Sequence, residues 1–398
     1  MGNVGYDVRR TRSSYLTVAL LFSTFLFSEV SHAQYTANFQ TNIISGVISN
    51  YSGDYYVGYT NYADVLLVEN GGALTSSVGA VGNGLDMWSS NNVAVIRGPG
   101  SVWDAVGGMW VGVAGPGNSL VISNGGLVVS GDGEVGVNAN GSSNNAVVVS
   151  DSGSAWKCAG SLLLGQATVY NSLVISNGAQ VVDASCEIGV AAPSSSNTVV
   201  VTGSGSVWSN EGAVVVGEFG GGNRLLVSNG GSVVATNLTV GLSSFACNNL
   251  LELDSGTITV ASRGYGGLEV LEVRQGELIV KGGMLQVDTL VITNPCAQFI
   301  HTGGTVLVGN LVFETNLFRI TSITRQSNDM LVTWMMGPGI SNTLQVSTGA
   351  ADGSYNPNSF ADIFVVTNNP TLGAVTNYLD VGAATNGSAR YYRARLIP

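Results

Sequence analysis

Asn223–Gly241, NRLLVSNGGSVVATNLTVG, is one copy of a unit that recurs along most of the 398-residue chain. Its frame reappears as NSLVISNGGLVV from Asn118 and NSLVISNGAQVV from Asn171, and a sister unit interleaves with it, as in NTVVVTGSGSVW from Asn197. The opening asparagines are residues 92, 118, 145, 171, 197, 223 and 249, so every step is 26 or 27 residues. A period this constant is typical of a solenoid.

Each unit has the pattern of three short strands. Counting the opening Asn as zero, positions two and four are aliphatic, as in Leu120 and Ile122, which predicts a strand that turns these positions inward. Turn-forming Asn and Gly follow, then a second short strand and a third that closes with an apolar residue and Gly, as at Val240–Gly241. Three strands and three corners make one coil of a parallel β-helix, and the crossover rule predicts a right-handed one.

Asn-Gly is also the strongest hairpin signal, and hairpins would give a sandwich or propeller instead. The constant coil length favours the β-helix, because it stacks like residues on like. We therefore expect one inward ladder, made of Leu120, Val147, Leu173, Val199 and Leu225. Position three should form an outward apolar ladder that serves β propensity, with docking of another chain or of the C-terminal domain as the alternative. Its residues are Val121, Val148, Val174, Val200 and Leu226.

Two kinds of coil alternate. The opening Asn and the closing Gly are 20 residues apart in the units that contain Trp, as from 92 to 112, and 18 apart in the others, as from 118 to 136. Trp103, Trp156 and Trp208 belong to the longer units, and we expect them to fill a wider section of the core. The alternative is a row of exposed rings that stack on sugars.

The N-terminal part has two segments before the clear repeats. Residues 1–33 are predicted to be a signal peptide, because three arginines precede an apolar stretch and a small-residue cleavage pattern. Residues 34–63 are irregular and rich in Tyr, and we expect them to cap the open end of the solenoid. A glycan-binding aromatic patch that includes Tyr55 and Tyr56 is the alternative interpretation.

The repeats are expected over residues 64–314, with two shorter coils near the end whose inward pairs are Leu271 with Val273 and Leu290 with Ile292. The repeat then disappears. Residues 315–398 show six or seven alternating segments, which predict a small β-sandwich of immunoglobulin or fibronectin type III kind with Trp334 in its core near Tyr391 or Tyr392. The fold class is therefore all-β, a right-handed parallel β-helix followed by a β-sandwich.

Composition excludes several kinds of partner. The formal net charge is −11, and the whole chain contains two lysines, Lys157 and Lys281. Without a basic face to neutralise phosphates, nucleic-acid binding and attachment to anionic membranes are not expected. Apart from the leader, no apolar run is long enough to span a bilayer, so we do not expect an integral membrane protein.

The residue types needed for catalysis are few and scattered. After the leader one histidine remains, His301, and we expect a structural role for it. Cysteines 158, 186, 247 and 296 lack metal-site spacing; the repeat register places Cys186 in the core, Cys158 and Cys247 in corners, and predicts no disulfide. We predict no catalytic residue, no cofactor and no metal.

Parallel β-helices also host polysaccharide lyases and glycoside hydrolases, which need clustered carboxylates. In this chain the aspartates of the repeats fall at different points of their coils, and we expect them at corners and on the surface. They are Asp104, Asp132, Asp151 and Asp183.

The LVISNGG and VVVTGSGSVW frames and the apolar-Gly closures over residues 92–260 resemble the repeat of PEP-CTERM-associated and autotransporter-like β-helix proteins of Gram-negative bacteria. The tail RYYRARLIP is similar to the end of sandwich modules on large secreted proteins of verrucomicrobial type. The chain departs from these families at its C-terminal end, where we expect neither the membrane-inserted unit of an autotransporter nor the apolar, basic PEP-CTERM anchor.

The resemblance implies an exported, surface-associated structural protein. Together with the scattered carboxylates it predicts a non-catalytic, adhesin-like rod that is extracellular or on the outer-membrane surface. Extracellular polysaccharide or cell-surface components are the expected partners, and the oligomeric state stays open. The alternative is a carbohydrate-binding or polysaccharide-cleaving β-helix protein.

Overall fold

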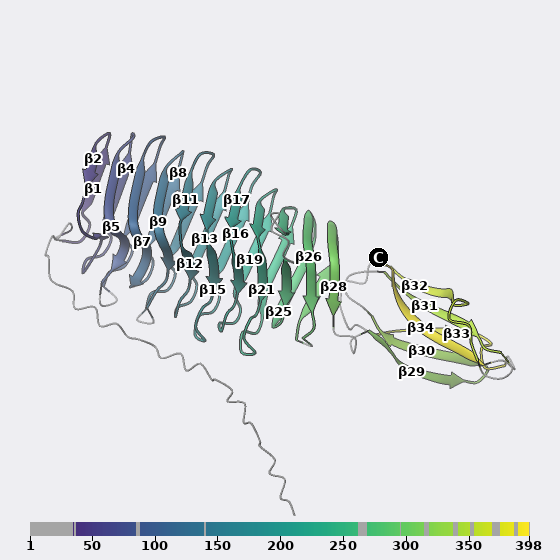
Figure 1. Ribbon diagram of the computed structural model, residues 1–398. Coiled ribbons are helices and arrows are strands. Elements are labelled where there is room, and N and C mark those ends of the chain that lie inside the picture. The colour runs from purple at the N-terminus through teal and green to yellow at the C-terminus, as the bar shows by residue number, and fades with distance from the viewer. Residues whose placement is uncertain are drawn as a thin grey trace, which may run out of the picture. The chain divides into compact units, whose positions relative to one another are not determined.

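The structure is a computed structural model that describes residues 35, 37–84, 88–138, 141–261, 269–294, 296–313, 318–336, 341–350, 354–367, 375–385 and 389–397. The predicted signal peptide, residues 1–33, lies outside the described residues. The described chain is all-β, a parallel β-solenoid followed by small antiparallel sheets, as predicted (Figure 1). The right-handed sense of coiling stays a prediction.

The first strand of every coil belongs to one eleven-stranded parallel sheet, called sheet A below (Figure 1). Its strands, in order, are β1 (Thr41–Ser45), β4 (Val65–Glu69), β6 (Val93–Arg97), β8 (Ser119–Ser123), β10 (Ala146–Ser150), β13 (Ser172–Ser176), β16 (Thr198–Thr202), β19 (Arg224–Ser228), β22 (Asn249–Asp254), β25 (Gly276–Val280) and β27 (Gln298–His301).

The second and third strands of each coil form two further faces. Near the ends of the solenoid single long strands cross both faces: β5 (Ala73–Asn83), β7 (Val102–Ala114), β9 (Leu127–Val135), β26 (Met284–Ile292) and β28 (Thr305–Phe313). Elsewhere the second strands are β2 (Ile48–Asn50), β11 (Ala155–Cys158), β14 (Gln180–Asp183), β17 (Val207–Asn210), β20 (Ser232–Ala235) and β23 (Thr257–Val260). The third strands are β3 (Tyr55–Val57), β12 (Ser161–Leu164), β15 (Ser185–Ile188), β18 (Ala213–Val216), β21 (Asn237–Val240) and β24 (Val270–Val273).

The register of sheet A confirms the inward ladder. Val147 pairs with Leu120 on one side and Leu173 on the other, and the series continues through Val199 to Leu225. Each of these side chains is at most 1% exposed. The side chains at position three are partly exposed, so the outward ladder is also confirmed.

The opening asparagines form a second, polar ladder inside the corner. The side-chain oxygen of each Asn accepts a hydrogen bond from the backbone N–H of the preceding one, as from Asn145 to Asn171 at 3.0 Å and from Asn171 to Asn197 at 2.9 Å. Before Asn92 the ladder continues through Asp64, whose N–H donates to Asn92, to Gln40, whose backbone N–H donates to Asp64; it ends at Asn249. Because buried polar groups must be hydrogen-bonded, this ladder explains why an Asn opens seven successive coils, from Asn92 to Asn249.

The closing glycines belong to the same corner. Gly112, Gly136, Gly165, Gly189 and Gly217 have φ between 72° and 81°, a conformation that suits glycine. A Cβ on any of them would lie 2.0–2.3 Å from the amide group of the Asn that opens the second coil further along the chain, as for Gly112 and Asn145. Asn and Gly therefore recur together, because a residue without a Cβ is needed where the Asn side chain lies.

The three tryptophans alternate with valines in one inward ladder of the second face. Trp103 pairs with Val128, Trp156 lies between Val128 and Val181, and Trp208 follows Val181. A Cβ on Gly79 would lie 2.6 Å from the Trp103 ring, and one on Gly133 would lie 2.6 Å from the Trp156 ring. Two of the shorter coils thus supply glycine where the next longer coil places an indole ring.

Both ends of the solenoid differ from the prediction. Residues 34–63 contain a complete first coil, β1 to β3, which pairs in parallel with β4 and β5; Gln40 stands in place of the opening Asn and donates its N–H to Asp64 at 2.8 Å. At the other end, Leu271 and Leu290 point inward as predicted but belong to third strands, while the first strands are β25 and β27.

The C-terminal part contains two three-stranded antiparallel sheets. One has the order β29 (Arg319–Gln326), β30 (Asp329–Met335), β33 (Val375–Asp380), and the other β32 (Ala361–Val366), β31 (Ser341–Thr348), β34 (Arg390–Ile397). They share a core in which Trp334 is fully buried, lies edge-on to Phe364 at 6.1 Å and packs with Tyr392. The sandwich core around Trp334 is confirmed, and its assignment to the immunoglobulin or fibronectin kind stays a prediction.

Candidate functional site

The predicted tryptophan series is part of the core. Trp103, Trp156 and Trp208 are all 0% exposed, which confirms their burial and leaves no row of rings for a sugar to stack on. Each indole N–H donates to a side chain of the preceding coil: Trp103 to Ser76 at 3.1 Å, Trp156 to Ser130 at 3.1 Å and Trp208 to Asp183 at 2.5 Å. Burying the rings thus leaves none of these donors unpaired.

The N-terminal tyrosines separate into core and surface. Tyr55 is 6% exposed and packs edge-on to Trp103 at 5.9 Å, so it belongs to the core and not to a glycan-binding patch. Tyr56 is half-buried, donates its hydroxyl to Asp54 at 2.7 Å and stacks on Tyr59 at 5.4 Å. Tyr51 lines a shallow cleft of about 440 Å³ with serines 52, 76 and 77.

The four aspartates do not gather. Asp132 is exposed and accepts the N–H of Ser161, and Asp151 occupies a corner at φ 74°, as expected. Asp183 differs from the prediction, since it is 1% exposed at the end of β14 and accepts hydrogen bonds from Trp208 and Asn210. Burial raises the pKa of Asp183 to about 7.

A carboxyl pair that the sequence did not reveal lies where two coils meet. Glu218 follows the closing Gly217 and hydrogen-bonds with Glu187, a half-buried residue of β15. Burial, with the charge of Glu187 beside it, raises the pKa of Glu218 to about 7. The pair therefore holds a proton near neutral pH, which is the state that a general acid requires.

The remaining reactive side chains are dispersed. Cys186 is in the core as predicted, but Cys158 is buried in β11 and not in a corner; all four cysteines are free thiols, and burial raises the pKa of Cys158 to about 12. His301 ends β27 and stacks on Phe299 with a centroid separation of 6.2 Å. Among the described residues, no group of three or more His, Cys, Asp or Glu side chains could hold a metal ion.

The most regular surface is the outer side of sheet A over four consecutive strands. Their outward side chains stand in three columns, with an aliphatic column in the middle and mostly hydroxyl columns on both sides. We call this surface the Ser/Val face. It consists of Ser119, Val121 and Ser123 of β8, Ala146, Val148 and Ser150 of β10, Ser172, Val174 and Ser176 of β13, and Thr198, Val200 and Thr202 of β16.

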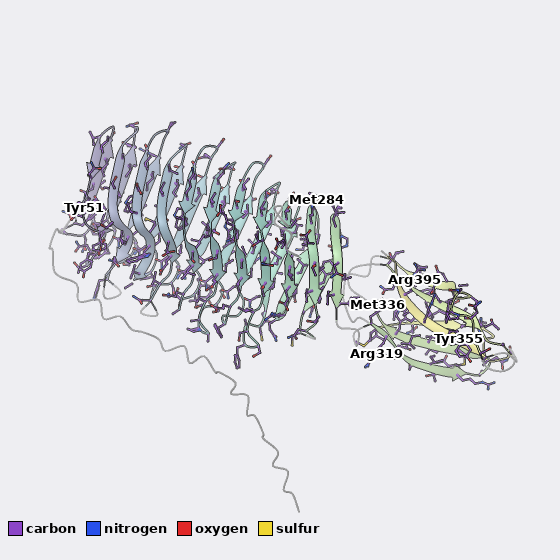
Figure 2. The ribbon with its side chains drawn as sticks, viewed as in Figure 1. Tyr51, Met284, Arg319, Met336, Tyr355 and Arg395 are labelled. Carbon is purple, nitrogen blue, oxygen red and sulfur yellow. The ribbon has the colours of Figure 1, made fainter. Side chains whose placement is uncertain are left out.

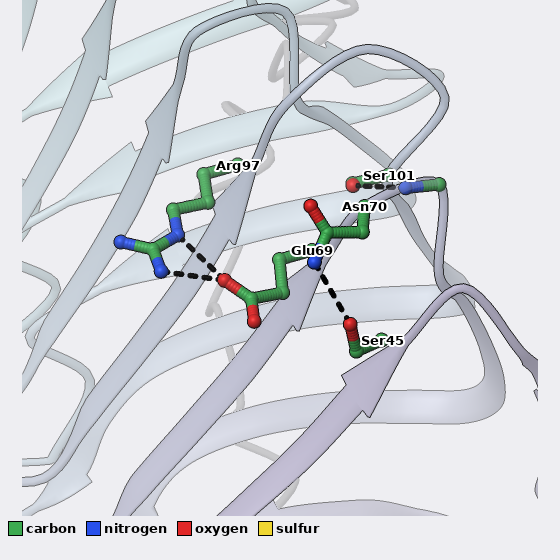
Figure 3. Close-up of polar contacts among 6 residues, drawn as sticks. Ser45, Glu69, Asn70, Arg97 and Ser101 are labelled. Carbon is green, nitrogen blue, oxygen red and sulfur yellow. Dashed lines mark hydrogen bonds and ion pairs between the residues drawn. The ribbon is translucent and has the colours of Figure 1, made fainter.

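The Ser/Val face carries no charged side chain, although the chain has a net charge of −11. Charges appear on sheet A directly before and after it. On one side the Arg97 guanidinium pairs with Glu69 at 2.5 Å, from neighbouring strands β6 and β4 (Figure 3). The other side holds Glu252, where burial disfavours the charge but hydrogen bonds from Lys281 and Arg224 outweigh it and lower the pKa.

The geometry of the Ser/Val face suits an extended, repetitive partner. Strands in a sheet lie about 4.8 Å apart, so hydroxyl groups recur at that spacing along the solenoid over about 14 Å. Hydroxyls can both donate and accept hydrogen bonds, and the valine column offers apolar contact between them. The outward alternation indicated the valine column. The charged border of the face was found only from the strand register, which places Glu69, Arg97 and Glu252 on the same sheet.

Sequence reasoning also missed a set of exposed aromatic rings in the corner before the opening Asn. They are Trp88 at 69% exposure, Tyr170 at 61%, Phe219 at 46% and Phe245 at 78%. The sequence holds one signal for them: Trp88, Phe219 and Phe245 each precede an opening Asn by four residues.

The fold and surface define a β-solenoid protein. No protein-family model, curated protein or solved structure matches this chain. The resemblance of its repeat to PEP-CTERM-associated and autotransporter-like proteins therefore stays a prediction. In the part of the chain that the structure describes, there is no helix with the length and apolar character needed to span a membrane.

Proposed function

We propose that this protein is an exported, non-catalytic scaffold that acts in an adhesin-like manner, with the Ser/Val face as its contact surface for an extracellular polymer. The observation that carries the proposal is the charge-free, threefold column pattern repeated on four strands and bounded by ion pairs. A surface that repeats along a rigid axis matches a partner that also repeats, and polysaccharide is the extracellular polymer with the most hydroxyl groups to pair.

Export supports the same interpretation. The leader at residues 1–33 predicts secretion, and the hydrogen-bonded ladder gives the solenoid internal support from the coil of Asp64 to that of Asn249. A protein outside the cell needs such support against unfolding and proteolysis. We therefore place the protein outside the cell or on the outer-membrane surface.

The test is a screen of the purified protein against plant, algal and bacterial polysaccharides that scores binding and cleavage separately. We expect binding without cleavage, and we expect the double variant Val148→Lys/Val200→Lys to abolish it. The matched control is Val182→Lys/Val234→Lys, which places the same charges two strands apart on half-buried valines of the second face. Equal binding by the two double variants would contradict the proposal.

A second candidate function, polysaccharide cleavage, is favoured by the Glu187 and Glu218 pair. Glycoside hydrolases and lyases use a carboxyl group that is protonated near neutral pH as a general acid, with a second carboxyl group beside it. Cleavage in the same screen that disappears in Glu218→Gln, with binding retained, would replace the scaffold proposal by this one.

A further inference from the structure

A cleft lies at the corner where the second and third faces of the solenoid meet, in the first three coils. It measures about 440 Å³ and is lined by residues 51–52 of the first coil, 75–77 of the second and 106–107 of the third. The structure describes the chain without a gap over residues 37–84 and 88–138, which contain all of them. We propose that this cleft binds one residue of a neutral oligosaccharide, with the sugar ring against Tyr51.

The shape of the cleft results from the different lengths of neighbouring coils. At this corner the first coil has four residues, 51–54, where the register gives the second coil three, 76–78. The third coil likewise has Val106 and Gly107 where the second has only Ser77. A strand with an extra residue bulges away from its partner, so the longer coils form the two walls and the shorter coil between them forms the floor.

Tyr51, near the N-terminal end of the solenoid, is the aromatic wall of the cleft (Figure 2). Its half-buried ring meets the ring of Tyr55, a core residue, edge-on with a centroid separation of 5.6 Å. Its backbone N–H donates to the Thr75 carbonyl at 2.8 Å, and the Ser77 N–H donates to the Gly53 carbonyl at 2.9 Å. A ring that is already held in place loses little conformational freedom when a sugar packs on its accessible part.

The floor of the cleft contains a buried hydroxyl group, that of Ser76. This residue is 1% exposed, and its oxygen accepts the Trp103 indole N–H at 3.1 Å. Ser130 holds the same position two coils later and donates its own hydroxyl to the Cys158 sulfur at 3.4 Å. Beside Ser76 the place of that cysteine is taken by Ala105, which offers no acceptor, and no other described residue accepts the Ser76 O–H. This donor is therefore available to a ligand in the cleft.

The remaining polar groups suit a sugar. The described lining has serine and threonine hydroxyls on the floor and on one wall, and Val106 and Tyr51 provide apolar surface on opposite walls. Hydroxyls both donate and accept hydrogen bonds, as the hydroxyls of a sugar do, and the ring carbons of a sugar can pack on the apolar walls. Binding sites for small ligands typically combine apolar walls with a few such polar groups.

The charge around the cleft favours a neutral sugar. The described lining contains no charged side chain, and Asp54 and Asp104 each lie two residues along the chain from a lining residue. Asp104 is also paired across the sheet with Thr75 of the lining. A uronic acid would therefore meet like charge and no basic partner, whereas a neutral ring can exchange its water for the hydroxyls of the lining.

Calorimetry with the full chain tests the inference, using neutral gluco-, manno- and xylo-oligosaccharides of four to six units and oligomers of alginate and polygalacturonate. We expect at least one neutral series to bind and the acidic series to bind at least tenfold more weakly. Val106→Arg introduces a long side chain on the exposed wall of the cleft and should abolish binding. The matched control is Ala159→Arg, at the same corner position of the next longer coil, which should leave the affinity unchanged.

Further variants separate this site from the Ser/Val face and from effects on folding. Tyr51→Ala should weaken binding at least tenfold, while Tyr51→Phe retains the ring and should keep most of the affinity. Val148→Lys/Val200→Lys should leave the oligosaccharide affinity unchanged, so the failure of one proposal is distinct from the failure of the other. Absence of binding by every neutral series, equal or tighter binding of the acidic oligomers, or equal affinities in Val106→Arg and Ala159→Arg would each overturn the inference.

Discussion

At the scale of the residue, Asp183 shows how a contact that repeats from coil to coil changes when one coil has a different residue at the shared position. Ser76 and Ser130 accept the indole N–H in two coils, and Asp183 accepts it in the third. Burial raises the Asp183 pKa to about 7, above its ordinary value of 3.8. The folded protein therefore holds this proton more tightly than the unfolded chain, and the stability contribution falls as pH rises from about 4 to 7.

Asp183→Ser should remove this pH dependence. We expect the free energy of unfolding of the wild type to fall relative to the variant between pH 4 and pH 8, by on the order of 2–4 kcal/mol. Urea titrations at a series of pH values measure the difference, and other titrating groups cancel because both proteins contain them. A constant difference across this range would show that Asp183 is ionised in the folded state at low pH.

Asn171 tests the polar ladder. Asn171→Ala removes the acceptor of the Asn145 backbone and side-chain N–H groups, which donate to it at 3.0 and 3.2 Å. Leaving buried donors unpaired should cost about 1–3 kcal/mol in the free energy of unfolding. Asn138→Ala, at an exposed corner, is the control and should change it by less than about 0.5 kcal/mol. Equal losses in urea titrations would contradict a special role of the ladder.

At the scale of the element, the alternating coils depend on a match between glycine and tryptophan. Gly133→Ala would place its Cβ 2.6 Å from the Trp156 ring and 2.9 Å from Leu162. Overpacking of this kind should lower the free energy of unfolding by about 1–3 kcal/mol. The control is Gly53→Ala, whose Cβ would meet its nearest neighbour at 3.6 Å.

A double-variant cycle measures this match directly. Trp156→Phe makes space beside residue 133, so Gly133→Ala should cost less in that background than in the wild type. Thermal melts of the four proteins give the coupling energy. Additive losses would show that the alanine is accommodated elsewhere and that the two coils do not depend on each other here.

The same scale shows what the sequence could predict. Period and alternation were sufficient for sheet A and for the ladder through Val147 and Leu173, because each coil repeats one local rule. Burial of the tryptophans was predicted from the greater length of their coils, since periodicity did not indicate which way the rings point. They were insufficient for the first coil, where Gln40 replaces the opening Asn, and for Asp183, whose burial depends on Trp208 in another coil. The Glu187 and Glu218 pair was missed for the same reason, since a contact between coils has no signature within either coil.

At the scale of the whole molecule, the Ser/Val face raises the question of self-association. An apolar column on a sheet face can join two copies of a chain, yet here hydroxyl columns flank it on both sides. We expect the oligomeric mass from light scattering to be the same for the wild type and for Val148→Lys/Val200→Lys. A fall in mass for the variant would mean that the face joins two copies of the chain instead of binding a polymer.

The alternation of coils also sets how the length of this rod can change during evolution. Asn145 and Asn197 are 52 residues apart, and both open a coil that contains Trp. Excision of residues 145–196 would bring Trp208 onto Ser130 and Gly133, the partners that Trp156 has now. Duplication of the same block would set Trp156 of the second copy onto Asp183, where Trp208 lies now. Gene rearrangements can therefore shorten or extend the protein in two-coil steps, whereas loss of one shorter coil, or duplication of one coil that contains Trp, would set two tryptophans against each other.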